Sequence, residues 1–322
     1  MSPFNFGRRT LLQGAAAAIV SSTGLSRLLD DSGQSVPNST GTNHPALKAP
    51  PNAADCHVHI FDPSRFPPPP EGLGEHTRSN DTVADYRLLQ KRNGTTRVVF
   101  VTPRSYVTDN RCTMDAIALM APNARGVGVL RPDVTDAELK TLNKAGIRGI
   151  RFTTGGTNPI VTIDMIEPLA KRIADLGWHV QLFMSPEQTV QVADVLRRLP
   201  TPIVFDHMGG LPQPEGITHP AYGIVRSLID KGRTWVKISG AYINTKTGPP
   251  AYADSTAVAQ AYVKAAPERL VWGSDWPHQG QKGVPDDAIL FDLLTTWVPD
   301  AAQRKRILVD NPETLYGFSK PI

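Results

Sequence analysis

Four residues that can accept and donate protons follow three separate β-rich runs of the chain. His57 and His59 lie two positions apart in DCHVHIF, His207 ends PIVFDH, and Asp275 lies in GSDWPH. Alternate residues of a strand point to the same side, so both imidazoles of the first run can enter one cavity. Imidazole and carboxylate are the usual general bases and are also ligands of Zn²⁺. An HxH pair alone favours two surface histidines, but the combination with His207 and Asp275 favours a catalytic site.

The segments that carry these residues belong to a chain in which strands and helices alternate. Helical patterns are expected at 163–176, at 188–199 and at 135–145, where Thr135 and Glu138 form a capping box. Such alternation requires parallel strands joined by helical crossovers, and eight units predict an α/β fold of the (β/α)8 TIM-barrel type. The barrel is expected to be a single domain over residues 52–322. Short β-rich runs predict its strands at 54–60, 97–102, 125–130, 146–153, 178–184, 202–207, 235–239 and 269–273.

In a parallel barrel the carboxyl ends of all strands meet at one rim, where barrel enzymes carry out their chemistry. His57, His59, His207 and Asp275 are all expected at that rim. Two long segments also follow strands, at 62–81 with its run of four prolines and at 208–220, and both are expected to cover the mouth. No glycine-rich loop follows the first strand, which excludes a dinucleotide-binding fold.

Composition narrows the possible partners. The 322 residues include 34 Lys and Arg against 30 Asp and Glu, a formal charge of +4 without blocks of like charge, so nucleic acid is not an expected partner. Cys56 and Cys112 form no CxxC pair, which excludes a zinc ribbon or redox motif. One disulfide remains open, but Cys56 lies within a predicted strand, and two unpaired thiols are favoured.

The N-terminus has the pattern of an export leader. Arg8 and Arg9 precede a short apolar run at 11–20, which is typical of a twin-arginine signal over residues 1–29. The run is too short to span a bilayer, so no stable membrane span is expected; an amphipathic helix or surface anchor is the alternative. Residues 30–51 are rich in Ser, Gly, Asn and Pro and predict a linker. A periplasmic location is therefore expected.

The order of the motifs adds a family resemblance. DCHVHIF, GIRGIRF, VFDHMGG, VKISGAY, LVWGSDWPH and DNPETLYGF resemble the amidohydrolase superfamily over residues of about 53–318. Within it the chain is most similar to the branch of 2-pyrone-4,6-dicarboxylate lactonases, sulfomuconolactone hydrolases and galactarolactone isomerases. The resemblance implies that Asp275 takes a proton from the attacking water. It also implies that His57, His59 and His207 polarise a lactone carbonyl or, together with Asp275, hold Zn²⁺.

Substrate contacts are also implied by the resemblance. Arg151, in GIRFT, matches an arginine that binds a substrate carboxylate, a role that suits the planar guanidinium; a salt bridge inside the barrel is the alternative role. Arg104, Tyr106 and His278 lie near predicted strand ends and are further candidates for substrate binding. Tyr242 and Asn244 are weaker candidates at the same rim.

Two departures from the family pattern bear on cofactor and substrate. Metal-dependent members place another histidine at the end of the fifth strand, whereas His179 lies at its start, followed by Gln181 and Phe183. The ligand set for Zn²⁺ is thus incomplete, and His179 is expected to be structural. Thr157 stands where the pyrone lactonases have a second arginine, and Arg104 could supply the missing charge.

These observations predict a hydrolase that opens a small anionic lactone, with a sulfomuconolactone type preferred. Three alternatives remain: a lactone isomerase, a decarboxylase of the same superfamily, and an exported binding protein with an inactive barrel. The sequence does not decide between a monomer and a homo-oligomer.

Overall fold

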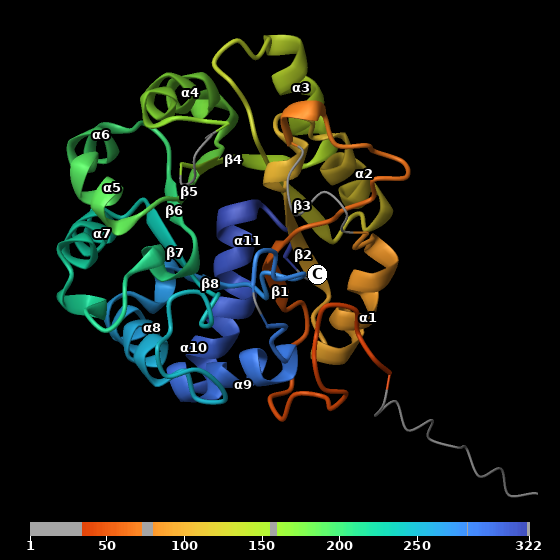
Figure 1. The fold of residues 1–322 in the computed structure, drawn as a ribbon. Coiled ribbons are helices and arrows are strands. Elements are labelled where there is room, and N and C mark those ends of the chain that lie inside the picture. Colours follow the sequence, from red (N-terminus) through yellow and green to blue (C-terminus); the bar gives the residue numbers. More distant parts are fainter. Residues whose placement is uncertain (1–33, 73–79, 155–159, 282, 321–322) are drawn as a thin grey trace, which may run out of the picture. The chain divides into compact units, whose positions relative to one another are not determined.

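A ring of eight parallel strands forms the centre of the computed structural model, which describes residues 34–72, 80–154, 160–281 and 283–320. Neighbours in the ring are neighbours in the sequence, from β1 to β8. A parallel bridge between Val58 and Trp276 joins the segment that follows the last strand to the first strand. The prediction of an eight-stranded α/β barrel is therefore confirmed (Figure 1). The strands are β1 (Ala54–Val58), β2 (Arg97–Val101), β3 (Ala124–Gly128), β4 (Ile147–Thr153), β5 (His179–Phe183), β6 (Ile203–Phe205), β7 (Thr234–Ile238) and β8 (Leu270–Trp272).

Helices follow the strands and surround the ring (Figure 1). The capping box predicted at Thr135 and Glu138 begins α3, and the expected helix at 163–176 is present with short 3-10 turns at both ends. The helix expected at 188–199 instead begins after Ser185, which caps it, and is interrupted at Val192. The helices are α1 (Val83–Asn93), α2 (Arg111–Leu119), α3 (Asp136–Ala145), α4 (Ile166–Ile173), α5 (Pro186–Gln191), α6 (Ala193–Arg198), α7 (Pro220–Asp230), α8 (Ala253–Ala265), α9 (Asp287–Trp297), α10 (Ala301–Lys305) and α11 (Asn311–Tyr316).

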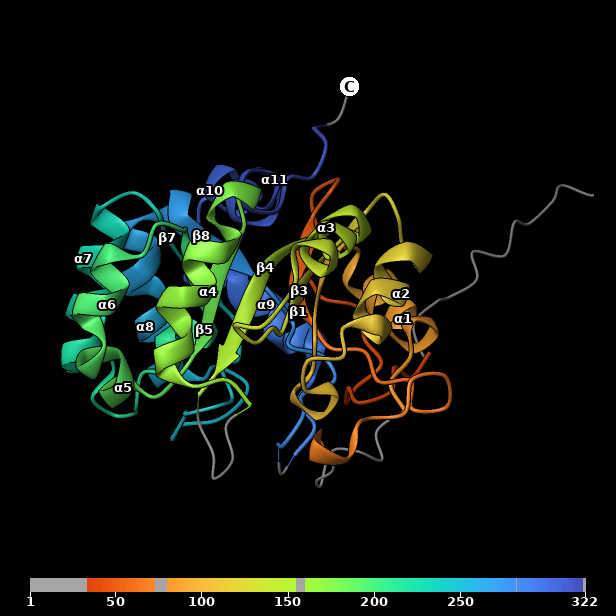
Figure 2. The ribbon, with the colours of Figure 1, turned by 90° about the horizontal axis from the view of Figure 1, so that it is seen from above.

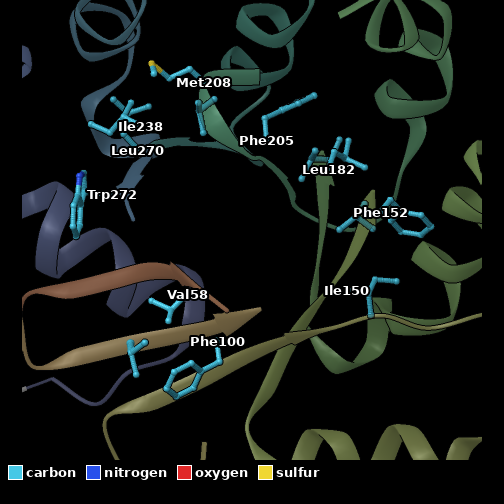
Figure 3. Close-up of a cluster of buried hydrophobic side chains, with 14 of the residues drawn as sticks. Val58, Phe100, Ile150, Phe152, Leu182, Phe205, Met208, Ile238, Leu270 and Trp272 are labelled. Carbon is cyan, nitrogen blue, oxygen red and sulfur yellow. The ribbon is translucent and has the colours of Figure 1, made fainter. Parts of the chain in front are cut away.

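Alternate strand residues divide the core into two clusters. One set packs between the ring and the helices, and Figure 3 draws 14 of its members, among them Phe100, Leu182 and Trp272, distributed around the ring. The intervening residues, such as Val99, Val204 and Val271, belong to a second cluster. Because successive side chains of a strand point to opposite faces, this second cluster fills the barrel interior.

The two ends of the barrel differ. Tyr316 at the end of α11 and Phe318 beyond it belong to the interior cluster, so they close the end at which the strands begin. The loops that follow the strands gather at the opposite end, as Figure 2 shows. The carboxyl ends of the strands are therefore the end that is open to form a pocket.

Residues 34–51, which the sequence suggests as a linker, contain no helix or strand and lie along the barrel. The Trp276 indole donates to Pro37 O at 2.7 Å, and Asp287 N and Arg92 Nη1 both donate to Ser39 Oγ at 3.1 Å. We call residues 34–51 the N-terminal arm. The leader assigned to residues 1–29 lies outside the described residues.

Two further expectations concern the rest of the chain. Cys56 and Cys112 are both buried and unbridged. Among the helices of the described ranges, none combines the length and apolar character needed to cross a bilayer.

Candidate active site

Asp275 lies against three imidazoles at the carboxyl ends of the strands. Its Oδ1 is 3.5 Å from Nε2 of His57, 3.7 Å from Nε2 of His59 and 3.6 Å from Nε2 of His207. The two histidines of β1 touch each other through their Nε2 atoms at 3.1 Å. The structure thus brings together all four residues that the sequence places at the rim.

Backbone irregularities aim these side chains at one point. An extra residue in β1 between Asp55 and Val58 shifts the register against β2 and turns His57 toward the interior. Asp275 has a φ of 65° and His207 a φ of 47°, conformations that are unusual for residues with a Cβ and that cluster at functional sites. Asp275 N donates to His57 O at 2.9 Å, so this backbone hydrogen bond holds Asp275 beside His57.

Two of the imidazoles are oriented by hydrogen bonds on their far nitrogens. His59 Nδ1 lies 2.7 Å from Val101 O, and His207 Nδ1 lies 3.0 Å from Ser239 Oγ. A carbonyl oxygen only accepts, so His59 Nδ1 carries the proton and its Nε2 has the lone pair. The Phe183 ring packs edge-on against His207 at 5.3 Å and limits its rotation.

Two opposite charges lie beneath the imidazoles, on neighbouring strands. Lys237 of β7 is fully buried, and its Nζ donates to Gln181 Oε1 at 2.8 Å and lies 3.4 Å from Asp206 Oδ1. The other Asp206 oxygen accepts from Arg151 Nε at 2.9 Å and from Gln181 Nε2 at 3.1 Å. Buried charges are tolerated where they are paired and hydrogen-bonded, and this network meets both conditions.

The environment shifts the pKa values of the site in a consistent direction. Burial lowers the pKa of His57, His59 and His207, to about 4 for His59, so all three are neutral at pH 7. Burial alone would raise the pKa of Asp275, but the three imidazoles and Tyr242 hold it below its usual range. Asp275 is therefore ionised beside neutral imidazoles across the physiological range.

A hydrogen-bonded chain runs from Asp275 away from the imidazoles. The Tyr242 hydroxyl donates to Asp275 Oδ2 at 2.7 Å and lies 2.8 Å from His278 Nδ1. His278 Nε2 is 3.1 Å from Oδ2 of the buried Asp287. Burial raises the pKa of Tyr242, so its hydroxyl keeps the proton that fixes the Asp275 carboxylate.

A pocket of about 530 Å³ opens above the four residues. Its walls combine two arginines, Arg151 from β4 and Arg104 from the turn after β2, with apolar side chains. Arg151 uses its Nε–H on Asp206, and its guanidinium has no other hydrogen-bond partner among the described residues. The alternative role considered for Arg151, a salt bridge inside the barrel, is present, and the side chain also lines the pocket. The lining residues are His59, Phe61, Glu71, Gly72, Pro103, Arg104, Ser105, Arg151, Thr153, Ile160, Phe183, His207, Ile243, Asp275, Gln279 and Gln281.

Two of the residues predicted to bind substrate lie behind this wall. Tyr106 is fully buried, and its hydroxyl accepts a hydrogen bond from Asp62 N at 3.0 Å, which fixes the loop after β1. His278 contacts Asp275 through Tyr242 instead of facing the pocket. Both lie near strand ends as expected, but a strand end alone does not determine which way a side chain points.

The remaining expectations for the rim have separate outcomes. Of the two segments predicted to cover the mouth, 62–81 contributes Glu71 and Gly72 to the pocket, whereas the described pocket lining contains no residue from 208–220. That second segment packs against β7 and α8, and Asn244 Nδ2 donates to Gly210 O at 2.9 Å. Thr157 lies outside the described residues.

Sequence reasoning missed Lys237 and Asp206 as parts of the site. Lys237 stands in the otherwise apolar run WVKIS, and a lysine within a strand buried on both faces is a signal of an interior charge. Asp206 directly precedes His207, but its charged partners are Lys237 and Arg151 on other strands, which its place in the sequence does not reveal. His179 is buried at the start of β5 with its ring over Gly149, as expected of a structural residue.

Whether these residues suit a metal ion can be tested on their geometry. Tetrahedral Zn²⁺ with ligands at about 2.0–2.2 Å places its ligand atoms roughly 3.3–3.6 Å apart. His57, His59 and Asp275 form such a candidate group, with separations of 3.1–3.7 Å. The distances between the ligand atoms fit a zinc site, but the surroundings of His57 Nδ1, the nitrogen that points away from these atoms, do not. A ligand histidine normally donates its other N–H to an acceptor, whereas His57 Nδ1 lies between the donor Lys237 Nζ at 3.1 Å and the acceptor Asp206 Oδ1 at 3.2 Å.

The fold and the site define a class of protein: a barrel enzyme with a histidine–aspartate centre at the carboxyl ends of its strands. The amidohydrolase family model matches residues 54–318. The chain belongs to this family, which confirms the resemblance seen in its motifs.

Characterised relatives cover most of the barrel. A 4-sulfomuconolactone hydrolase of Rhizobium radiobacter is 34% identical over 83% of this chain and 91% of its own. A 2-pyrone-4,6-dicarboxylate hydrolase of Comamonas testosteroni is 33% identical over 84% and 92%. A D-galactarolactone isomerase of Agrobacterium fabrum is 31% identical over 84% and 92%. A crystal structure from Agrobacterium tumefaciens matches with a TM-score of 0.80 at 29% identity, over 88% of this chain and 99% of that chain.

Proposed function

We propose that this protein hydrolyses the ring ester of a small anionic lactone, with Asp275 as the general base. One observation carries the proposal: an ionised carboxylate lies 3.5–3.7 Å from three neutral imidazoles on a pocket lined by Arg151. Such a carboxylate can take a proton from water, and the arginine beside it can hold an anion. The relatives named as lactone hydrolases support the same reaction class.

Substrate binding begins with the free edge of Arg151. A guanidinium has five N–H donors in a planar fork, and Asp206 uses one of them in this site. The others can bind a carboxylate or sulfonate of the lactone and orient its ring toward Asp275. The Phe183 ring lies 5.3 Å from the guanidinium carbon and keeps the fork in one plane.

The attack needs a water molecule between Asp275 Oδ1 and the ring carbonyl. Asp275 takes one proton of this water while the oxygen bonds to the carbonyl carbon, and Tyr242 holds the other carboxylate oxygen in place. The charge that develops on the carbonyl oxygen requires a donor, which His207 supplies through Nε2 when Ser239 donates to its Nδ1. One such donor contributes on the order of 3 kcal/mol to the transition state.

Collapse of the intermediate breaks the ring C–O bond. Asp275 returns its proton to the leaving oxygen, so one water is consumed and the products are one hydroxyl or enol and one carboxylic acid, which releases its proton to solvent as a carboxylate. Base and acid are then the same group at different stages, and the site returns to its starting charge.

Among lactones we prefer a sulfomuconolactone type. The preference is supported by the 34% identical relative of that name and by a pocket whose two arginines, Arg104 and Arg151, suit acidic groups. A lactone isomerase is the second candidate, because the same base and donors can pass the acyl group to a hydroxyl of the substrate instead of water. The isomerase relative at 31% identity favours keeping this alternative.

The experiment is turnover of a lactone panel in ¹⁸O-labelled water. The panel contains 4-sulfomuconolactone, 2-pyrone-4,6-dicarboxylate and D-galactarolactone. Hydrolysis places one ¹⁸O in the new carboxylate, isomerisation places none, and decarboxylation releases carbon dioxide. Asp275→Asn should abolish turnover with the fold intact, whereas Asp194→Asn, whose side chain is 88% exposed, should act as wild type. Near-normal activity of Asp275→Asn, or no turnover of any lactone, would contradict the proposal.

We also propose that the protein acts in the periplasm, on the basis of Arg8 and Arg9 ahead of a short apolar run. Lys in place of both arginines should retain the full-length chain in the cytoplasm. Equal periplasmic recovery of both forms would argue against twin-arginine export.

A further inference from the structure

Lys237 is a charged side chain that the proposed reaction does not use. It is fully buried in β7, and its Nζ meets three groups: Gln181 Oε1 at 2.8 Å, His57 Nδ1 at 3.1 Å and Asp206 Oδ1 at 3.4 Å. Lys237 therefore touches the imidazole of His57 on the side opposite Asp275. A buried lysine at this place needs an explanation, because burial of an ammonium costs free energy.

The hydrogen bonds around His57 define where its proton lies. His59 Nδ1 donates to Val101 O at 2.7 Å, so His59 Nε2 has no proton and can only accept. His57 Nε2 is 3.1 Å from that atom and must be the donor. A neutral imidazole has one N–H, so His57 Nδ1 must accept, and Lys237 Nζ is positioned to donate to it. The hydrogen bonds on both ring nitrogens of His57 thus require the same neutral form, with the proton on Nε2.

The carboxylate near His57 does not compete in this arrangement. Asp206 Oδ1 lies 3.2 Å from His57 Nδ1, but an imidazole whose one proton is on Nε2 has no Nδ1–H to donate to this oxygen. A metal-binding imidazole would need that bond, because its far N–H donates to a carboxylate or carbonyl while the near nitrogen binds the ion. In the contact between Lys237 and His57, the far nitrogen Nδ1 accepts a hydrogen bond instead of donating one.

We infer that Lys237 is a positioning residue that holds His57 in the Nε2–H form and thereby prevents a divalent transition-metal ion from using His57 as a ligand. His57, His59 and Asp275 then keep the interatomic distances of a metal site, but hydrogen bonds instead of a metal ion hold the two imidazoles together. The inference concerns protonation and metal binding, so it can fail or hold independently of which lactone is the substrate.

The first test is the affinity for Zn²⁺ of chelator-treated protein. Lys237→Met removes the donor but keeps the length of the side chain, so Asp206 can accept from His57 Nδ1 and leave Nε2 to a metal. Partners of ligand histidines change metal affinity by about 10- to 100-fold, and we expect a gain of this size in the variant. Lys231→Met, at an exposed lysine, is the matched control and should bind as wild type.

Titration against a chromogenic chelator measures the affinity, and Co²⁺ absorption reports whether the bound ion is tetrahedral. A Lys237→Met protein that folds but binds Zn²⁺ no more tightly than wild type would overturn the inference. Stoichiometric Zn²⁺ held by wild-type protein through His57 would overturn it as well.

The second test uses unmodified protein and does not depend on folding of the variant. Long-range ¹⁵N–¹H NMR distinguishes the two neutral forms of each histidine, and His57→Gln identifies the signals of His57. We expect His57 to carry its proton on Nε2 and His59 to carry it on Nδ1. A proton on Nδ1 of His57 would refute the role of Lys237.

Discussion

Gly273 lies beneath His57, where the last strand closes against the first, and its replacement by alanine should disable the site. A Cβ at this position would lie 2.7 Å from His57 Cβ and 2.8 Å from His57 N. The second atom belongs to the backbone, so a change of rotamer cannot relieve the overlap. Gly273 is therefore required for the close approach of β8 to β1.

The size of the effect follows from the overlap. An ordinary contact of 3.4 Å exceeds 2.8 Å by about 0.6 Å, so β1 and β8 must separate by about this amount. Overpacking of this kind typically costs about 1–3 kcal/mol of unfolding free energy. The same shift moves His57 from Asp275, and because misplacement by 1 Å can cost about a hundredfold in rate, we expect kcat/KM to fall about 10- to 100-fold.

The assay pairs urea unfolding with lactone turnover for Gly273→Ala and one control. A Cβ at Gly223, in α7, would meet no heavy atom within 4 Å, so Gly223→Ala should raise the free energy of unfolding by about 0.4–1 kcal/mol and keep full activity. Wild-type stability and wild-type kcat/KM in Gly273→Ala would refute the view that this close approach fixes the site.

Three further predictions test the surroundings of the site. Tyr242→Phe removes the hydroxyl that donates to Asp275 Oδ2, so kcat should fall about 10- to 100-fold with little change in KM. The control Tyr222→Phe should keep the wild-type kcat, and equal kcat values in the two variants would contradict the role of Tyr242. The free energy of unfolding should fall as pH drops from 6.5 toward 4, because buried imidazoles with lowered pKa values take up protons only on unfolding. His59 alone accounts for a loss of about 3 kcal/mol at pH 4, which is partly offset by Asp55, whose pKa burial raises to about 6. A free energy of unfolding that stays constant in urea titrations over this pH range would exclude this linkage. Ser39→Ala leaves Arg92 Nη1 and Asp287 N without their acceptor and should lower the free energy of unfolding by about 1–2 kcal/mol. The exposed Ser35→Ala should leave it unchanged, and equal melting temperatures of the two variants would show that this contact of the N-terminal arm contributes no stability.

The sequence predicted the barrel because local and global signals agree in it. Each strand is a short apolar run, and each connection is long enough for a helix, which leaves a parallel ring as the arrangement that buries all the runs. The position of a residue at a strand end then follows from the fold, and this is why His57, His59, His207 and Asp275 could be grouped without coordinates.

What the sequence could not predict is the direction of side chains beyond the strands. Tyr106 and His278 both follow strands closely, but one turns into the core and the other behind Tyr242, because the turns after β2 and β8 have backbone angles that no periodic pattern encodes. The same limit applies to Lys237, whose three partners come from β1, from β5 and from the residue after β6. Contacts between strands distant in the sequence become apparent only once the ring is closed.

The interior cluster ends with Tyr316 and Phe318, which are synthesised after all eight strands. During translation the strand side chains of this cluster can therefore come together before the two side chains that seal the end at which the strands begin. Until both residues have emerged, the end of the barrel at which the strands begin stays exposed, so Tyr316 and Phe318 complete the core last. A tag fused directly after Phe318 would crowd this seal, so a flexible spacer should restore both yield and melting temperature.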